Sequence, residues 1–407
     1  MDIQFTQAIH GFQVGKITTA RYPGRRVVTL PITRESFTCP DCASPNVSAY
    51  AERQRPVMGL PVGRCTCLLL VTVHRLRCAA CGAKKYERLP FLSSPKARVT
   101  RQLERTIIEL RAHMSISAVA GFYGVNWKTV KDIEKTALQK KYAKVPLKGV
   151  KRIALDEIYA FPKAQAHEKY VTVVRDLDSG AVLEVARGKG ARALEAFTRR
   201  IRKFKKNITL VCMDMSNAYA AWAFQNLPNA EVVYDHFHLV KAMNDKLDSV
   251  RRRVARDMDQ AARASLKGLR FLLLRNAEGL NPDDAASLDA ARATCKELSD
   301  AYMLKEKLRS IYTVARDEFE AGTQLDAWCS LATQCAVPEM ESMAKTVCKH
   351  WTGILAYWRS GGASNASQEG FNNKIRWLIS QAYGFHDYEY FRLKIFDLPS
   401  TNIKKAL

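Results

Sequence analysis

Three acidic residues stand in contexts from which one metal-dependent active site can be assembled. Asp156 and Asp214 each end an apolar run with the pattern of a strand, and Glu369 lies in the polar segment 364–374, which has the pattern of a helix start. Carboxylates from two strand ends and a late helix can converge on a pair of divalent metal ions, and such a pair catalyses in-line displacement at a phosphodiester. The three residues therefore predict a phosphodiester-cleaving site that uses two Mg²⁺ or Mn²⁺ ions.

The elements that must position these carboxylates favour the same interpretation. One Asp alone at a strand end is typical of a turn or a helix cap, so the prediction depends on the joint placement of the three carboxylates on two strand ends and a late helix. The segment 150–240 has the pattern of three strands, a helix, a strand, a helix and a strand, over 151–161, 168–175, 181–186, 191–205, 208–213, 216–225 and 230–234. This is the order of an RNase H-like sheet, where the carboxylates of the first and fourth strands meet beside a helix that supplies the third. Glu157 is excluded because successive strand residues face opposite sides.

A long helical segment is predicted to interrupt this domain. Residues 241–360 have helical periodicity, and the domain resumes at 361–407. The early part of the insertion is basic. Its Arg251 and Arg252 are expected either to contact DNA or to belong to a solvated face.

Other side chains near the predicted triad have candidate roles of their own. Lys374 and Arg376 follow Glu369 on the late helix and are expected to steady a DNA backbone. His238 lies just after the fifth predicted strand. It is expected either to act at the site, by contacting a phosphate or orienting a carboxylate, or to pack against or cap the following helix.

Two CxxC pairs in the N-terminal segment predict a structural zinc site. The pairs lie 35 residues apart within a strand-rich domain, 1–95, and consist of Cys39, Cys42, Cys78 and Cys81. Each pair can aim two thiolates at one tetrahedral Zn²⁺, which makes a zinc ribbon; the alternative is four ordinary buried thiols. Cys65 and Cys67 are expected to pack rather than to bind metal.

The next domain, 98–145, has the pattern of a helix-turn-helix. Gly124 stands where the turn requires a positive φ, and Val130 returns the second helix to the core. An ordinary helical hairpin would share this pattern. The residues expected on the DNA-contacting face of the second helix are Asn126, Trp127, Lys128, Thr129 and Lys131.

The bulk properties agree with a DNA-binding protein. The chain has 407 residues, and 64 Lys plus Arg against 40 Asp plus Glu give a formal net charge of +24. Such a charge favours a polyanionic partner. The N-terminus lacks the pattern of a signal peptide and no apolar run is long enough to span a membrane, so no membrane partner is expected. Eleven cysteines without a secretory signal favour a reducing compartment, the cytoplasm.

Four motifs together resemble the ISL3 family of bacterial insertion-sequence transposases. They are 155–157, 211–216, 233–241 and 369–385, and the resemblance runs from the CxxC pairs to Ile395. It implies a DDE transposase with Asp156, Asp214 and Glu369 as the metal-binding triad. It also implies that the zinc ribbon and helix-turn-helix recognise the terminal inverted repeats of the element, in a bacterial, nucleoid-associated protein.

The expected fold is therefore a multidomain α/β protein: a zinc ribbon and a helix-turn-helix, then an RNase H-like catalytic domain interrupted by an all-helical insertion. The expected partners are double-stranded DNA, as inverted repeats and as target. Since two ends must be joined together, a homodimer or a higher oligomer is expected as well. The alternatives are a DNA-binding regulator with the same fold and a Mg²⁺-dependent structure-specific nuclease without strand transfer.

Overall fold

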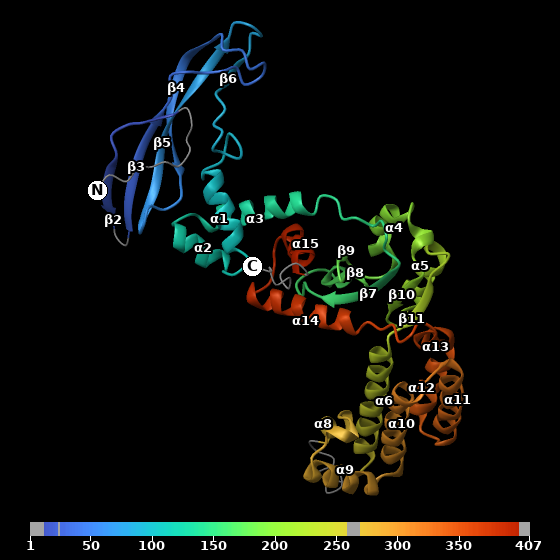
Figure 1. Ribbon diagram of the computed structural model, residues 1–407. Coiled ribbons are helices and arrows are strands. Elements are labelled where there is room, and N and C mark those ends of the chain that lie inside the picture. Colours follow the sequence, from blue (N-terminus) through green and yellow to red (C-terminus); the bar gives the residue numbers. More distant parts are fainter. Residues whose placement is uncertain (1–11, 23–24, 259–268, 399–407) are drawn as a thin grey trace. The chain divides into compact units, whose positions relative to one another are not determined.

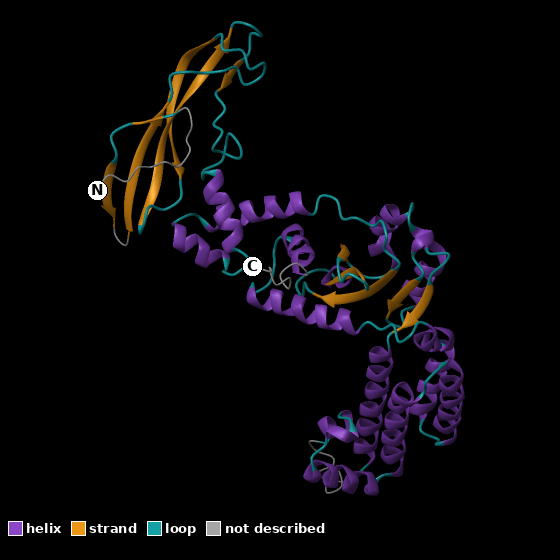
Figure 2. Cartoon of the chain, viewed as in Figure 1, coloured by secondary structure: helices purple, strands orange, loops and turns teal. Residues whose placement is uncertain are grey.

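The computed structural model describes residues 12–22, 25–258 and 269–398, and the chain divides into two compact units, Met1–Ala143 and Lys144–Leu407. Both units combine helices with a β-sheet, which confirms the predicted mixed α/β class (Figures 1 and 2). Within the three described ranges, no helix has the length and apolarity needed to cross a membrane.

The first unit begins with one six-stranded sheet. Its strands are β1 (Gln13–Val14), β2 (Thr18–Tyr22), β3 (Arg25–Thr33), β4 (Val47–Met58), β5 (Cys65–Cys78) and β6 (Lys84–Tyr86). The order is β1-β3-β5-β4, with β2 also paired to β3 and β6 to β5; only the β3–β5 pairing is parallel. Alternate residues of β5 are buried, and Leu69, Val71 and Val73 pack with Leu30 and Ile32 of β3.

Three helices complete this unit: α1 (Arg101–Leu110), α2 (Ile116–Tyr123) and α3 (Trp127–Lys141). Each begins at a side chain that accepts a hydrogen bond from its first turn, namely Thr100, Ser115 and Asn126. Between α2 and α3, Gly124 adopts φ 66°, the left-handed conformation that the sequence predicts for this turn. The helices share one apolar core, formed in part by Leu103, Ile107, Val119 and Val130.

The second unit contains a five-stranded sheet with the order β11-β10-β7-β8-β9. The strands are β7 (Arg152–Tyr159), β8 (Tyr170–Asp176), β9 (Val182–Arg187), β10 (Leu210–Met213) and β11 (Glu231–Tyr234). β7, β10 and β11 are parallel, whereas β8 and β9 run antiparallel to their neighbours. Each predicted strand is confirmed to within three residues at either end. The predicted helix 191–205 is instead broken into η2 (Ala191–Leu194), α4 (Glu195–Ile201) and η3 (Lys205–Asn207).

Different helices pack on the two faces of this sheet. On one face, α4 and α5 (Asn217–Asn226) bury Phe197 and Trp222 against Leu155 and Met213. The other face is covered at β11 by α13 (Trp351–Arg359), at β7 by α14 (Ala366–Gln381) and at β9 by α15 (Tyr388–Asp397). Figure 1 shows α14 alongside β7. Residues of β7 therefore face α5 or α14 in alternation.

A helical region lies between β11 and α14, as the sequence predicts. It comprises α6 (His236–Asp257), α8 (Arg270–Leu274), η4 (Ala277–Gly279), α9 (Pro282–Thr294), α10 (Lys296–Val314), α11 (Glu318–Gln334), α12 (Pro338–Lys349) and α13. These helices share a core of their own that includes Leu247, Leu304 and Trp328. The α13 helix approaches the sheet at Gly353, where an added Cβ would lie 2.4 Å from the Tyr234 ring.

Candidate active site, metal centre and DNA-binding elements

The register of two parallel strands brings Asp156 and Asp214 to the same place on the sheet. Leu210 pairs with Arg152 and Cys212 with Ala154, so Asp214, two residues after Cys212, stands level with Asp156, two residues after Ala154. Both carboxylates lie on the α14 face because strand residues alternate. Glu157 faces the other way, and its Oε1 accepts a hydrogen bond from Tyr219 Oη of α5 at 2.6 Å.

Two asparagines join α14 to this strand edge. At the start of the helix, Asn365 Nδ2 donates to the carbonyl oxygen of Leu155 at 3.2 Å. Two turns later, Asn372 Nδ2 donates to Asp156 Oδ2 at 2.5 Å. The Asn372 side chain is itself oriented by Gln368, whose Nε2 donates to Asn372 Oδ1 at 3.2 Å. Asn365, Gln368 and Asn372 are all buried. They were not identified from the sequence, since polar residues on a helix give no signal of which strand they will meet.

Glu369 lies on the same helix and is half-buried. Its Oε1 accepts from Arg376 Nη1 at 3.1 Å, and Arg376 also donates to Asn373 Oδ1 at 2.5 Å. The spacing i, i+4 and i+7 thus places Glu369, Asn373 and Arg376 on one side of α14. Glu369 is close enough to Asp156 for its charge to raise the pKa of the Asp156 carboxyl.

Asp235 and His238 form a fourth polar group at this edge. Asp235 is almost completely buried; it caps α6 by accepting from Phe237 N, and it also accepts from Asn365 N at 3.4 Å. Its Oδ2 lies 3.3 Å from His238 Nδ1. This contact raises the pKa of His238, as do the nearby Asp156 and Asp214 carboxylates, while burial opposes the rise. His238 is therefore both part of the first turn of α6 and electrostatically coupled to the two aspartates.

The electrostatics of the edge suit a divalent cation. Burial raises the pKa of both Asp156 and Asp214, and other carboxylates raise it further: Glu369 acts on Asp156, and Glu157 acts on Asp214. Clustered carboxylate oxygens are the donors that Mg²⁺ and Mn²⁺ prefer. Across the described residues, no three carboxylate or histidine ligand atoms lie within 4.8 Å of one another. The structure therefore places Asp156, Asp214 and Glu369 at the same edge of the sheet without gathering their oxygens into one compact ligand set.

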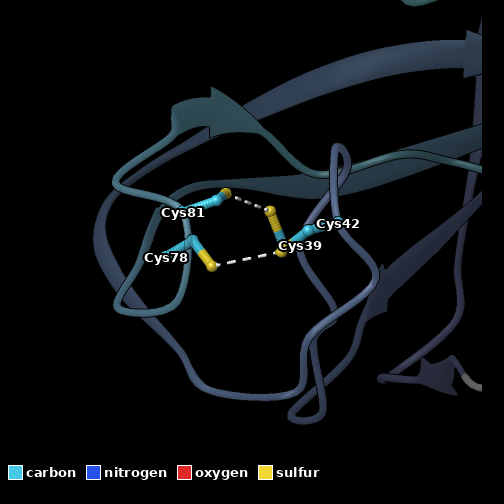
Figure 3. A group of neighbouring side chains, drawn as sticks. All are labelled: Cys39, Cys42, Cys78 and Cys81. Atoms are coloured by element: carbon cyan, nitrogen blue, oxygen red, sulfur yellow. Dashed lines mark hydrogen bonds between the residues drawn. The ribbon is translucent and has the colours of Figure 1, made fainter.

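The two CxxC pairs meet at one end of the β4–β5 ribbon (Figure 3). The Sγ atoms of Cys39 and Cys81 are 3.6 Å apart, those of Cys42 and Cys78 are 3.7 Å apart, and all four lie within 4.8 Å. Within the described ranges this is the single group of three or more metal-ligating side chains that is so compact. Backbone N–H groups of Cys42 and Asp41 lower the pKa of Cys39 to about 6, whereas contacts with the other thiols raise the pKa of Cys42 and Cys81, so Cys39 is the thiol most inclined to ionise.

The arrangement of the four cysteines is compatible with one tetrahedral zinc ion. Cys65 and Cys67 lie outside the cluster, and Cys67 is buried in the apolar core of the sheet, as predicted.

The residues expected to read DNA lie on and before the first turns of α3. Asn126 Oδ1 accepts from Lys128 N at 2.8 Å and so caps the helix, while its side chain remains on the surface. Trp127 is 51% exposed, with Lys128 Nζ 5.8 Å from its ring centroid. Thr129 and Lys131 are half-buried.

The basic residues expected to contact DNA in the second unit differ in their availability. Arg252 is well exposed, although it pairs with Asp248 at 3.2 Å, whereas Arg251 is largely buried by its own contact with the same Asp248. Lys374 is exposed on α14.

Comparison with known proteins assigns the family. The model of ISL3-type DDE transposases, described as Transposase, matches residues 153–395, and the Helix-turn-helix domain of transposase family ISL3 matches residues 87–137. The chain belongs to the ISL3 transposase family. The transposase for insertion sequence element IS1001 of Bordetella parapertussis is 30% identical over 390 residues, 95% of this chain and 94% of the relative. The transposase for insertion sequence element IS1557 of Mycobacterium tuberculosis is 29% identical over 311 residues, 70% and 68% of the two chains.

Family membership confirms the resemblance found in the sequence. The first matched segment contains the whole five-stranded sheet and α14, which carry the three carboxylates. The second contains α1, α2 and most of α3, so the predicted helix-turn-helix is confirmed rather than the ordinary hairpin. An ISL3-family protein with such a domain is a DNA-binding transposase.

Proposed function

We propose that this protein is a DDE transposase that binds the terminal inverted repeats of its insertion sequence, cleaves the DNA there and joins the cleaved end to target DNA. The observation that carries the proposal is the strand order β9-β8-β7-β10-β11, in which Asp156 on the central strand β7 is level with Asp214, just after the parallel strand β10. The α14 helix then brings Glu369 to the same edge. This order and placement support an RNase H-like catalytic domain.

Four domains, in five segments, follow from this proposal. Residues 1–95 form a zinc ribbon and 98–145 a helix-turn-helix. The catalytic domain comprises 150–240 and 361–407, and 241–360 is a helical insertion. The separate apolar core of the insertion supports this division.

Asp156, Asp214 and Glu369 would hold two Mg²⁺ or Mn²⁺ ions, which when bound supply Lewis acidity and a nucleophile at neutral pH. The protein's own groups prepare the site. Asn372 fixes one oxygen of Asp156, and its hydrogen bond opposes the rise in pKa that burial causes. Asp235 holds His238 through Nδ1 and raises its pKa, and the protonated imidazolium would present Nε2–H to a phosphate oxygen.

DNA would be held by basic side chains outside the carboxylate cluster. Lys374 and Arg376 flank the cluster on α14 and suit a phosphate backbone, and Arg252 adds an exposed cation on α6, where Arg251 is largely buried. In the first unit, Asn126, Trp127, Lys128, Thr129 and Lys131 would contact the inverted repeat, and one structural Zn²⁺ would be bound by the four clustered cysteines. Joining two ends requires a homodimer or a higher oligomer.

A strand-transfer assay tests the proposal. The full-length protein is mixed with a labelled duplex that carries the terminal repeat, a plasmid target and Mg²⁺, beside Asp156→Ala and Asp214→Ala variants. Joined product that needs Mg²⁺ and vanishes in both variants is the expected result. Cleavage without joining would identify a nuclease instead. Binding without cleavage by the unsubstituted protein would identify a DNA-binding regulator, and cleavage by Asp214→Ala would overturn the triad.

A further inference from the structure

The exposed side of α14 carries two aromatic rings beyond the carboxylate. Trp377 is 66% exposed and Tyr383, just after the helix, is 100% exposed. Trp377 follows Glu369 and Asn373 in an i, i+4, i+8 row, so it lies about 12 Å further along the helix axis and about 80° around it. Large aromatic side chains normally bury their rings. Other rings of the chain are as exposed, Phe224 and Phe319 among them, but Trp377 and Tyr383 lie on and just after the helix that carries Glu369 and so form a candidate binding surface.

Tyr383 has a second unusual property. It adopts φ 51°, a conformation that disfavours any residue with a Cβ, and it occupies the position at a helix end where Gly is usual. Gly384 N donates to Ile379 O at 2.9 Å and so closes the helix end with Tyr383 in this conformation. Because the ring is completely exposed, no packing among the described residues compensates for the backbone cost. A Tyr here is therefore unfavourable for folding.

The charges around the two rings select the class of partner. Lys374 is exposed on the same helix, Arg376 is 53% exposed, and the whole chain has a formal net charge of +24. An aromatic ring flanked by exposed cations fits a nucleic-acid strand, because the bases stack on the rings while the cations contact the phosphates. An apolar protein surface would not require these cations.

We propose that Trp377 and Tyr383 form a base-stacking platform that binds unpaired bases of the DNA strand leaving the catalytic carboxylates. This inference rests on the proposed function and extends it from the scissile phosphate to the neighbouring nucleotides. A strand advances about 3.4 Å per nucleotide when stacked, so Trp377 meets a base about three or four nucleotides from the cleaved bond. Tyr383 meets a base about two or three nucleotides further along.

The platform is tested first by base fluorescence in a complex that cannot react. Asp156→Ala protein is mixed with a terminal-repeat duplex bearing a single-stranded tail on its flanking side, with 2-aminopurine placed at one tail position at a time. We expect quenching by stacking at a position about three or four nucleotides from the junction, and its loss when Trp377→Ala is added to the same protein. Retention of the quenching in that double variant would overturn the proposal. This readout does not depend on cleavage.

The second test is an activity cycle on otherwise unsubstituted protein. Trp377→Ala should lower cleavage between about 5-fold and 100-fold, and Trp377→Phe should retain most of it. An abasic nucleotide at the quenched position should slow the unsubstituted protein equally and should slow Trp377→Ala no further. If Trp377→Ala and the abasic nucleotide each lowered the cleavage rate independently, so that their combined loss were the product of the two, stacking between them would be contradicted. Phe224→Ala is the matched control, since Phe224 is 87% exposed on α5, which covers the other face of the sheet.

Tyr383 allows a test in which stability and activity move in opposite directions. Tyr383→Gly should raise the melting temperature by about 2 °C because it removes the unfavourable backbone conformation, yet it should lower cleavage; Tyr383→Phe should leave both unchanged. A stabilised variant of full activity would remove Tyr383 from the platform.

A change of oligomeric state in Trp377→Ala would assign the rings to a subunit contact and overturn the proposal. Absence of Mg²⁺-dependent cleavage by the unsubstituted protein would instead overturn the proposed function, with the fluorescence result unaffected.

Discussion

The orientation of the Asp156 carboxylate depends on one hydrogen bond to each of its oxygens. Oδ1 accepts from Glu157 N at 2.7 Å, and Oδ2 accepts from Asn372 Nδ2. Burial raises the pKa of Asp156, whereas these two hydrogen bonds and the nearby His238 lower it. Asn372 therefore both aims the carboxylate and favours the ionised form that a metal ion requires.

Asn372→Ala should lower the rate of cleavage by about 10-fold to 100-fold, a range typical for loss of a group that orients a metal ligand. Affinity for the inverted repeat should be unchanged, because that contact belongs to the first unit. The measurement is single-turnover cleavage at saturating protein. Asn373→Ala is the matched control: its residue is exposed and contacts Arg376 rather than Asp156. Equal losses in the two variants would show that Asn372 has no special role.

At the scale of elements, Arg175 of β8 holds the start of α14 against the sheet. Its Nη1 donates to Ser367 O at 2.8 Å, its Nη2 donates to Gly180 O at 3.0 Å, and its guanidinium lies 4.2 Å from the Phe371 ring centroid. Burial lowers the pKa of Arg175 to about 10, still well above neutrality. One cation thus fixes the first two turns of the helix that carries Glu369.

Arg175→Lys should keep the charge but lose the planar fork and the stacking on Phe371. We expect faster amide hydrogen exchange in the first turns of α14 and a cleavage rate at least about 10-fold lower, since small displacements of catalytic groups are costly. Arg187→Met on the neighbouring strand serves as the control, because Arg187 is half-exposed and pairs with Glu168. Exchange in α14 that is unchanged in Arg175→Lys would exclude the anchoring role.

The helices of the insertion are joined by a charged contact whose strength depends on pH. Arg253 of α6 donates to both Glu339 oxygens at 2.9 Å, and this contact lowers the pKa of Glu339 below 4.5. A lowered folded-state pKa stabilises the fold above the unfolded pKa, and the contribution is lost as the pH falls through the folded value.

Glu339→Gln should therefore lower the free energy of unfolding at pH 7 by about 1 kcal/mol, and the difference from the unsubstituted protein should shrink as the pH falls below about 4.5. Denaturant titrations at several pH values measure it. Glu341→Gln is the control on the same helix, since Glu341 makes an exposed i, i+4 pair with Lys345 and should contribute only about 0.3 kcal/mol. If the difference in free energy of unfolding between Glu339→Gln and the unsubstituted protein grew on acidification, the stabilising role of the ionised Glu339 would be contradicted.

The elements also show where sequence reasoning succeeds and where it stops. The strands that carry Asp156 and Asp214 were predictable because buried parallel strands are short apolar runs with polar ends. The turn at Gly124 was predictable for a similarly local reason. The contact between Asn372 and Asp156 joins residues 216 positions apart, and the parallel pairing of β3 with β5 is equally non-local. No local pattern encodes such contacts, because they arise only when separate elements pack.

At the scale of the whole molecule, the two metal chemistries belong to different compact units. The four-cysteine cluster lies in Met1–Ala143, whereas the carboxylates lie in Lys144–Leu407. A closed site of four thiolates stabilises structure and leaves no position for a substrate. The four-cysteine cluster therefore bears on how the first unit folds, and the proposed carboxylate site on the proposed chemistry.

Removal of zinc should consequently separate binding from chemistry. Elemental analysis should find about one zinc per chain, and Cys78→Ser should lose it, since structural zinc contributes directly to folding. Because the N-terminal sheet is continuous with α1 through the pairing of Met58 with Val99, we expect affinity for the inverted repeat to fall at least about 10-fold. The melting transition of the second unit should be unchanged. Cys65→Ser, outside the cluster, is the control and should keep both the zinc and the affinity for the inverted repeat. If Cys65→Ser lost as much affinity as Cys78→Ser, the effect would come from the sheet and not from the metal.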